Sequence, residues 1–168
     1  MDKQKEQNFI QILDRNKDKI YRICKIYAVS PIEPQDLFQE VVFQIWKSLP
    51  TFKGKSNINT WIYKITLNVC YSSKKKLERG NNKSVRLESI EFKLSDINSD
   101  KNQPERYKAL RQCISSLKES HQSLIILYLE ELPYKEIAKI TGLTENNVAV
   151  KMKRIRKILL NCITPKLK

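Results

Sequence analysis

Hydrophobic residues recur three or four positions apart along most of this 168-residue chain, with polar residues between them. No run alternates between hydrophobic and polar residues for long. The first spacing places side chains on one face of an α-helix, whereas strict alternation is typical of a β-strand. The pattern therefore predicts an all-α protein.

The helical pattern is interrupted once. Residues 78–103 are polar, contain turn-forming residues and show no sustained periodicity, which is typical of a linker. A chain of this length can bury a core in each of two small units. We expect two small helical domains, residues 1–77 and 104–168, joined by a flexible linker.

Charge adds two basic surfaces to this picture. The formal net charge is +14; residues 51–86 hold nine Lys or Arg against the single Glu78, and residues 151–168 hold seven against no acid. Residues 30–46 carry only acids among their charged residues. Such segregation indicates two contacts with a polyanion and a separate partner face, although a basic surface that merely keeps the protein soluble would give the same totals.

Few residues are available for metal or cofactor chemistry. Cys24, Cys70, Cys113 and Cys162 are scattered, and His121 is the only histidine. The spacing of these residues does not match that of zinc ligands, so we expect buried structural thiols and no cofactor. The absence of a long apolar run or a leader pattern predicts a cytoplasmic protein.

Residues 36–49 form a two-sided helical pattern. The hydrophobic half contains Leu37, Phe38, Val41, Val42, Ile45, Trp46 and Leu49. The polar half contains Asp36, Gln39, Glu40, Gln44 and Lys47, with Phe43 in their midst. One exposed aromatic residue is common in soluble proteins. Because acids flank it in a basic protein, Phe43 also suits a contact with a basic protein partner.

A second helix is expected over residues 60–76, preceded by a small, basic loop at residues 52–59. Its apolar side carries Trp61, Ile62, Ile65 and Val69, and a polar stripe beside Trp61 carries Lys64, Asn68, Tyr71 and Lys75. Lysines neutralise phosphates, and aromatic rings stack on unpaired bases for about 1–3 kcal/mol per base. A solvated lysine face over a core tryptophan fits the same pattern.

Residues 134–159 have the layout of a helix-turn-helix. Ala138 is small where two helices would cross, Gly142 suits a turn with positive φ, and Val148 would pack inward. Thr144 is expected to cap the second helix. The buried stripe of that helix is predicted to be Val148, Met152, Ile155 and Leu159.

The outer face of this second helix is predicted to be polar and basic. It would carry Asn146, Asn147, Lys151, Lys153 and Arg154, with Arg156 and Lys157 toward its end. Amides near the start of a recognition helix can pair with adenine, and the cations behind them can bind phosphate. A packed helical hairpin that binds no DNA is the alternative interpretation.

With these motifs in hand, the chain resembles an extracytoplasmic-function sigma factor, and the likeness covers both blocks. The segment DLFQEVVFQIW resembles the family's helix that docks on the clamp helices of the largest subunit of core RNA polymerase. The resemblance implies that Asp36, Gln39, Glu40 and Phe43 bind the polymerase. It also implies an anti-sigma factor as a further partner, and no small-molecule substrate.

Two further segments resemble the family's promoter-binding parts. FKGKSNINTWIYKITLNVCYSSKKK resembles the part that opens the minus-ten element and captures a base of the single strand. Its candidate residues are Lys53, Ser56, Asn57, Trp61, Lys64 and Asn68, with Tyr71 and Lys75 of the same stripe. The second block resembles the domain that reads the minus-thirty-five element as duplex. Its candidate residues are Asn146, Asn147, Lys151 and Arg154, with Thr144, Lys153 and Arg156 beside them.

The chain departs from the family at two places. Where the family commonly shows Ser-x-Gly-Thr-Val-Lys, residues 144–149 read TENNVA, so no base preference can be carried over. Residues 74–76 are lysines where relatives tend to carry arginine, and lysine makes point contacts rather than forked ones.

Two other functions fit parts of the chain. A stand-alone helix-turn-helix regulator would explain the second block, but it would leave Phe43 and Trp61 without a role and would normally dimerise. A recombinase or nuclease needs a nucleophile or a metal-binding carboxylate cluster, and the sequence shows neither. The resemblance instead implies a protein that acts by binding, without covalent chemistry.

Overall fold

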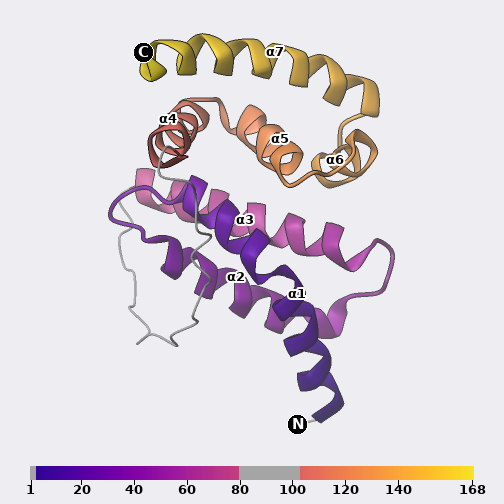
Figure 1. Cartoon of the computed structure of the whole chain (residues 1–168). Coiled ribbons are helices and arrows are strands. Elements are labelled where there is room, and N and C mark those ends of the chain that lie inside the picture. Colours follow the sequence, from indigo (N-terminus) through magenta and orange to yellow (C-terminus); the bar gives the residue numbers. More distant parts are fainter. Residues whose placement is uncertain (1–2, 80–102) are drawn as a thin grey trace. The chain divides into compact units, whose positions relative to one another are not determined.

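The computed structural model describes residues 3–79 and 103–168, which form two compact units (Figure 1). Unit 1 contains α1 (Lys3–Tyr27), α2 (Pro34–Ser48), the 3-10 turn η1 (Leu49–Thr51) and α3 (Ile58–Glu78). Unit 2 contains α4 (Gln103–Ser115), α5 (Glu119–Leu129), α6 (Tyr134–Thr141), α7 (Glu145–Ile163) and η2 (Thr164–Leu167).

The prediction of an all-α fold is confirmed, since the described residues contain helices and no strand. The linker predicted over residues 78–103 lies outside the described residues, except for residues 78, 79 and 103. None of the described helices is long and apolar enough to cross a membrane. In the same described residues, no group of three or more His, Cys, Asp or Glu side chains could hold a metal ion.

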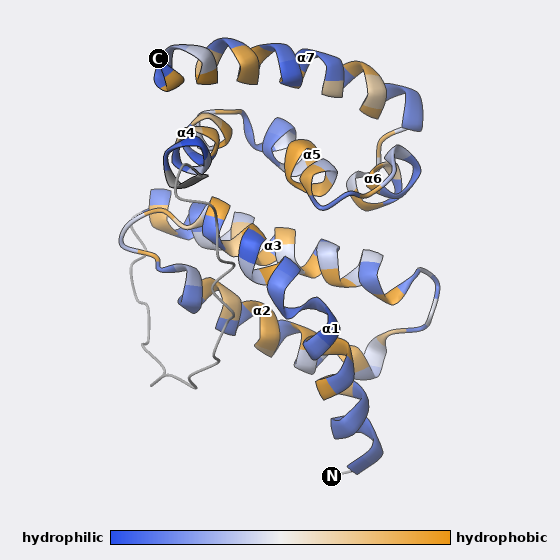
Figure 2. Ribbon diagram, viewed as in Figure 1, coloured by the Kyte–Doolittle hydropathy of each residue, from blue (hydrophilic) through white to orange (hydrophobic). Residues whose placement is uncertain are grey.

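In unit 1 the three long helices pack against one another around a hydrophobic core, and Figure 2 shows hydrophobic and polar positions alternating around each helix. Ile23 of α1, Val41 of α2 and Ile62 of α3 are almost completely buried. Thr66 is also buried, and its hydroxyl donates to the Ile62 carbonyl at 2.9 Å. This hydrogen bond satisfies a polar group that would otherwise be costly inside the core.

Helix α2 follows the predicted division between its two halves. Leu37, Phe38, Val41 and Ile45 are buried, and the other residues of the predicted hydrophobic half are partly buried. The helix begins two residues earlier than predicted because Pro34 occupies its first turn, where the missing N–H costs no hydrogen bond.

In unit 2, α5 is the most enclosed helix. Residues 122–127 are all buried, and a helix that is hydrophobic all round lies inside a bundle rather than at its surface. The predicted stripe of α7 is confirmed, since Val148, Met152, Ile155 and Leu159 are all buried. Gly142 ends α6 with φ 76°, as the turn pattern predicted.

The cysteines differ in part from the prediction of four buried thiols. Cys24 and Cys70 are buried free thiols, but Cys113 and Cys162 are joined by a disulfide between α4 and α7. Their Cα atoms are 5.9 Å apart, although their sequence separation is 49. Only the packing of α4 against the end of α7 brings them together, so their spacing in the sequence gave no sign of the bond.

Replacing Gly142 tests the turn between α6 and α7. A Cβ at this position would meet no atom within 4 Å, so Gly142→Ala adds backbone strain without a steric clash. We expect a loss of about 1 kcal/mol in the free energy of unfolding, measured by urea denaturation of the full chain. Gly142→Asn should lose less, because asparagine tolerates the left-handed region. Unchanged stability in Gly142→Ala would show that the turn adopts another conformation in solution.

Candidate functional surfaces

The outer side of α2 carries the first candidate surface, the α2 acidic face, which consists of Asp36, Gln39, Glu40 and Phe43. The spacing of three and four residues places all four on one side of the helix. Asp36 and Glu40 are exposed, Gln39 is partly exposed, and 54% of Phe43 is exposed. An apolar ring among oxygen acceptors suits a partner that combines hydrophobic and basic groups.

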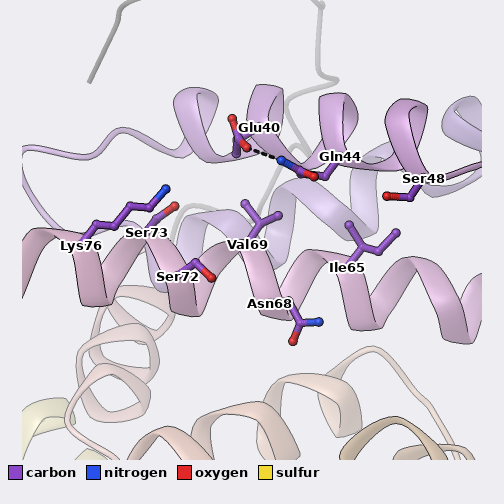
Figure 3. A pocket seen from close by; sticks show the side chains of 9 residues that line it. All are labelled: Glu40, Gln44, Ser48, Ile65, Asn68, Val69, Ser72, Ser73 and Lys76. Carbon is purple, nitrogen blue, oxygen red and sulfur yellow. Dashed lines mark hydrogen bonds between the residues drawn. The ribbon is translucent and has the colours of Figure 1, made fainter. Parts of the chain in front are cut away.

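A groove of about 360 Å³ runs between α2 and α3 beside this face (Figure 3). It is lined by Glu40, Gln44, Ser48, Ile65, Asn68, Val69, Ser72, Ser73 and Lys76. The Gln44 side chain donates a 2.8 Å hydrogen bond to the Glu40 carboxylate, as Figure 3 shows. Because Glu40 belongs to the α2 acidic face and Asn68 to the polar stripe of α3, the groove connects the two candidate surfaces.

Most of the predicted stripe on α3 is open to solvent. Lys64, Asn68 and Lys75 are exposed, and Trp61 is half-buried beside them. Tyr71 differs from the prediction of an open stacking surface. Its ring lies edge-on to Tyr27 at 5.4 Å between centroids, and the two hydroxyls are hydrogen-bonded at 3.2 Å. Part of the Tyr71 ring is therefore used to hold α3 against α1.

The apolar side of α3 is wider than predicted. Besides Ile62 and Val69, the buried set contains Thr60, Tyr63, Thr66, Leu67 and Cys70. Trp61 and Ile65, which were predicted on the apolar side, lie at its edges and are only half-buried. The reason is that α3 packs against both α1 and α2, so a wider part of its surface is buried.

The loop before α3 combines a structural cap with exposed basic residues. The side-chain oxygen of Asn57 accepts the N–H of Asn59 at 2.9 Å and caps α3, so one of its acceptors is already used. Lys53 and Ser56 are exposed. The ring of Phe52, which the sequence analysis did not single out, lies 5.0 Å from the Trp61 ring. Its position as the first residue of the basic loop was the signal that could have identified it.

The helix-turn-helix of α6 and α7 presents the predicted outer face. Asn146, Asn147, Lys153 and Arg154 are exposed, and Lys151 is half-buried. The predicted cap is confirmed, because the Thr144 hydroxyl accepts the N–H of Asn147 at 3.2 Å. The Thr144 cap therefore stabilises the first turn of α7, where the side-chain amides of Asn146 and Asn147 are exposed.

Arg156 has intramolecular partners that the sequence did not indicate. Its guanidinium donates to the Tyr134 hydroxyl at 3.1 Å and lies 4.6 Å from the centre of the Tyr128 ring. These contacts join α7 to α5 and α6 at an exposed position. Arg156 therefore helps to hold α7 against α5 and α6, and it is exposed at the surface.

A cluster of positive charge extends from α7 to the start of α5. Partial burial, followed by the charges of Lys151, Lys118 and Arg154, lowers the pKa of His121 below its ordinary value of 6.5. His121 is therefore mainly neutral at pH 7, and the cations on α7 and at the start of α5 form one surface that an anion could bind. Lys118 and His121 are about thirty positions before α7, so no helical spacing connects them to it.

Comparisons with known proteins match both units. The family model described as Sigma-70 region 2 matches residues 12–80, and the model described as Sigma-70, region 4 matches residues 107–159. RNA polymerase sigma factor SigV of Bacillus subtilis (strain 168) is 27% identical over 86% of this chain and 84% of its own length. ECF RNA polymerase sigma factor SigW of the same organism is 26% identical over 90% and 86%.

Solved structures share the fold. The sigma factor RpoE of Bartonella quintana, in complex with the anti-sigma factor NepR, has a TM-score of 0.65 and 19% identity, covering 96% of this chain and 97% of that one. CnrH, in complex with the cytosolic domain of CnrY, has a TM-score of 0.63 and 15% identity, covering 92% and 86%. At such identities the likeness extends to the fold alone.

A stand-alone helix-turn-helix regulator would account for unit 2 but not for a match to Sigma-70 region 2 over most of unit 1. Both sigma regions occur here in one chain, and the similar curated proteins are sigma factors over most of their length. The chain therefore belongs to the extracytoplasmic-function family of sigma factors, the non-catalytic subunits that bind core RNA polymerase and direct promoter-specific transcription initiation.

Proposed function

We propose that unit 1 docks on the clamp helices of the largest polymerase subunit through the α2 acidic face. The observation that carries this proposal is the 54% exposure of Phe43 on a helix whose opposite side is buried. An exposed aromatic ring contributes little to the stability of the fold. In an interface, the same ring contributes buried hydrophobic area and contacts at its edge. The neighbouring Asp36 and Glu40 supply charge for a basic partner.

The α3 stripe and the preceding loop are proposed to bind the opened minus-ten element. Lys53, Lys64 and Lys75 are exposed for contact with phosphates, and Trp61 lies between them with part of its ring open. Stacking of a base on Trp61 and phosphate neutralisation by these lysines would offset the cost of unpairing a few bases.

The outer face of α7 is proposed to read the minus-thirty-five element in the major groove. Asn146 and Asn147 lie in the first turn of α7, where side chains of a recognition helix reach base edges. Lys151, Lys153 and Arg154 would bind the flanking phosphates. The cations around His121 support this assignment, because a phosphate would neutralise their charge.

The setting of this activity also belongs to the proposal. A polymerase subunit acts where the chromosome is, so we place the chain in the cytoplasm, associated with the nucleoid. Since RpoE of Bartonella quintana binds the anti-sigma factor NepR, an anti-sigma factor is also a proposed partner of this chain. Any tethering to the membrane would then come through that partner.

Removing the Phe43 ring tests polymerase docking. Phe43→Ala should weaken binding to bacterial core RNA polymerase about thirtyfold, the effect of losing a hot spot worth about 2 kcal/mol. Binding is measured by titrating the labelled full chain with core enzyme and by co-elution in size-exclusion chromatography. Glu40→Lys should also weaken binding, because it reverses a charge at the proposed interface.

The matched control for Phe43→Ala is Ile10→Ala, since Ile10 on α1 has nearly the same exposure, 55% against 54%. This control should bind core polymerase like the unsubstituted chain. Circular dichroism of each variant separates lost docking from lost folding. Wild-type affinity in a folded Phe43→Ala variant would contradict the proposed docking face.

The α3 stripe is tested on an AT-rich single-stranded oligonucleotide bound by the holoenzyme. Trp61→Ala should weaken binding roughly fivefold to 150-fold, the equivalent of about 1–3 kcal/mol of stacking. Lys64→Gln should reduce the slope of log affinity against log salt by about 0.7, the value for one phosphate contact on a single strand.

Two controls accompany the stripe variants. Trp61→Phe keeps a ring beside Phe52 and should retain most of the affinity. Lys139→Gln removes a lysine of α6 that is 3.1 Å from Glu136, and it should leave the salt slope unchanged. An equal change in slope for Lys64→Gln and Lys139→Gln would refute a local phosphate contact at Lys64.

The duplex reader is tested by selecting bound sequences from a randomised duplex pool. Asn146→Ala should relax the preference at one base pair by about 1–3 kcal/mol. Lys153→Gln should weaken all sequences alike and reduce the salt slope by about 0.9. The proposed division between base and phosphate contacts would be disproved if Asn146→Ala weakened all sequences alike and Lys153→Gln changed the preference at one base pair.

A further inference from the structure

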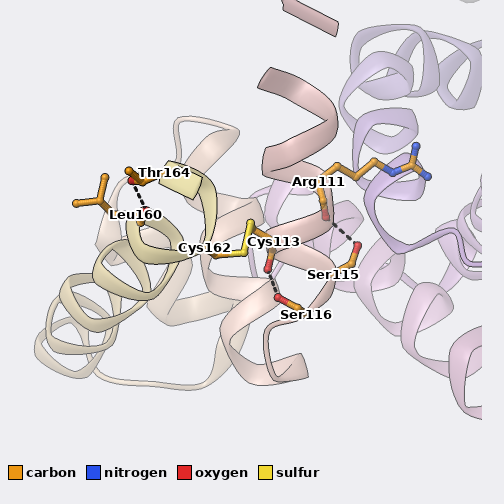
Figure 4. Close-up of a disulfide and its surroundings, with 7 residues drawn as sticks. All are labelled: Arg111, Cys113, Ser115, Ser116, Leu160, Cys162 and Thr164. Atoms are coloured by element: carbon orange, nitrogen blue, oxygen red, sulfur yellow. Dashed lines mark hydrogen bonds between the residues drawn. A yellow bond between two sulfur atoms is a disulfide. The ribbon is translucent and has the colours of Figure 1, made fainter. Parts of the chain in front are cut away.

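The disulfide between Cys113 and Cys162 encloses the DNA-binding part of unit 2. Cys113 lies near the end of α4 and Cys162 near the end of α7, as Figure 4 shows. The residues between them, 114–161, include α5, α6 and almost all of α7. The bond therefore closes a covalent loop around the entire helix-turn-helix.

Such a bond is unusual in a subunit of bacterial RNA polymerase. Transcription takes place in a compartment where small thiols keep most cysteines reduced, and disulfides that form there are typically transient and redox-sensing. The two cysteine residues also differ in exposure, since Cys113 is 1% exposed whereas Cys162 is partly exposed. A small reagent from solvent would reach Cys162 first.

We propose that Cys113 and Cys162 form a reversible redox modification site that controls the stability of unit 2. The reactants are low-molecular-weight thiols and disulfides of the glutathione class. A thiolate attacks the Cys162 sulfur, the bond between the cysteines breaks, and Cys113 leaves as a thiolate that takes a proton. A second thiolate then attacks the outer sulfur of the mixed disulfide, which releases the small disulfide and frees Cys162. The reverse sequence reduces the small disulfide and oxidises the protein pair.

Hydrogen bonds hold the backbone around both cysteines independently of the sulfur bond. The Ser116 hydroxyl donates to the Cys113 carbonyl at 2.7 Å at the end of α4 (Figure 4). The Thr164 hydroxyl donates to the Leu160 carbonyl at 2.6 Å, and these two residues flank Cys162 in the chain. Reduction therefore leaves each helix end formed, and the packing of α4 against α7 and η2 keeps the two thiols near each other, so that the bond can form again.

The consequence of oxidation is a more stable unit 2. Closing a loop of this length restricts the unfolded chain and raises the temperature at which the enclosed helices unfold. The proposal of a redox site does not depend on the proposed function. Only its effect on DNA binding rests on the assignment of α7 as the duplex reader.

Unit 1 supplies the internal comparison. Cys24 and Cys70 are both buried, 0% and 1% exposed, and have no disulfide. A hydrogen bond with Cys70, and then burial, raise the pKa of the Cys24 thiol well above its ordinary value. A buried protonated thiol reacts slowly, so Cys24 should not respond to the same reagents, and burial shields Cys70 from them.

The site is tested on the native full chain in buffers of stepped reduced-to-oxidised glutathione ratio. Free thiols are trapped by alkylation and located by mass spectrometry. We expect Cys113 and Cys162 to change together and reversibly, while Cys24 and Cys70 remain thiols throughout. A bond that resists reduction until the chain unfolds, or thiols that never pair in excess oxidised glutathione, would overturn the proposal.

The effect on stability is measured by thermal unfolding of the same samples. Oxidation should raise the melting temperature of unit 2 by about 10 °C. Cys113→Ser should melt like the reduced chain under both conditions, and Cys70→Ser should keep the full difference. Equal melting temperatures for oxidised and reduced chains would refute control of stability by this bond.

Duplex binding is then compared at a temperature between the two melting points. The reduced chain should bind a randomised duplex at least tenfold more weakly than the oxidised chain. If the melting temperatures differ but neither form binds duplex, the assignment of α7 as the duplex reader fails and the redox site remains. If both forms bind equally at that temperature, control of DNA binding by this bond is refuted.

Discussion

The rotation of each helix about its own axis is the constraint on which the rest of this structure depends. Val148, Met152 and Ile155 are 0% exposed, so α7 cannot turn without lifting these side chains out of the core of unit 2. Since successive residues on a helix are about 100° apart, fixing the buried side also fixes the outer side. Asn146 and Lys153 therefore face solvent as a consequence of core packing.

The same constraint exposes Phe43 on α2. Val41 and Ile45 are buried against the other helices of unit 1, and this packing leaves Phe43 at the surface. Hydrophobic burial thus stabilises the unit and at the same time presents an aromatic ring that folding does not use. Surfaces of this kind are typical of proteins that work as subunits, because their last apolar contacts are made with another chain.

Positive charge is concentrated in one part of unit 2. Partial burial, and then nearby cations on α7 and at the start of α5, lower the pKa of His121. DNA phosphates would pair favourably with these cations. The contacts of Arg156 with Tyr134 and Tyr128 and the disulfide hold the helices of the same unit together.

The sequence by itself determined the all-α class, the faces of α2 and α7 and the turn at Gly142, because helical spacing and the backbone needs of a turn are local properties. It also predicted the exposure of Phe43 and the cap at Thr144. Only the tertiary structure decided that Tyr71 packs on Tyr27, that Arg156 binds Tyr134 and that Cys113 joins Cys162. Periodicity shows which side of a helix is buried but not which distant residues meet it, since that depends on how the helices pack.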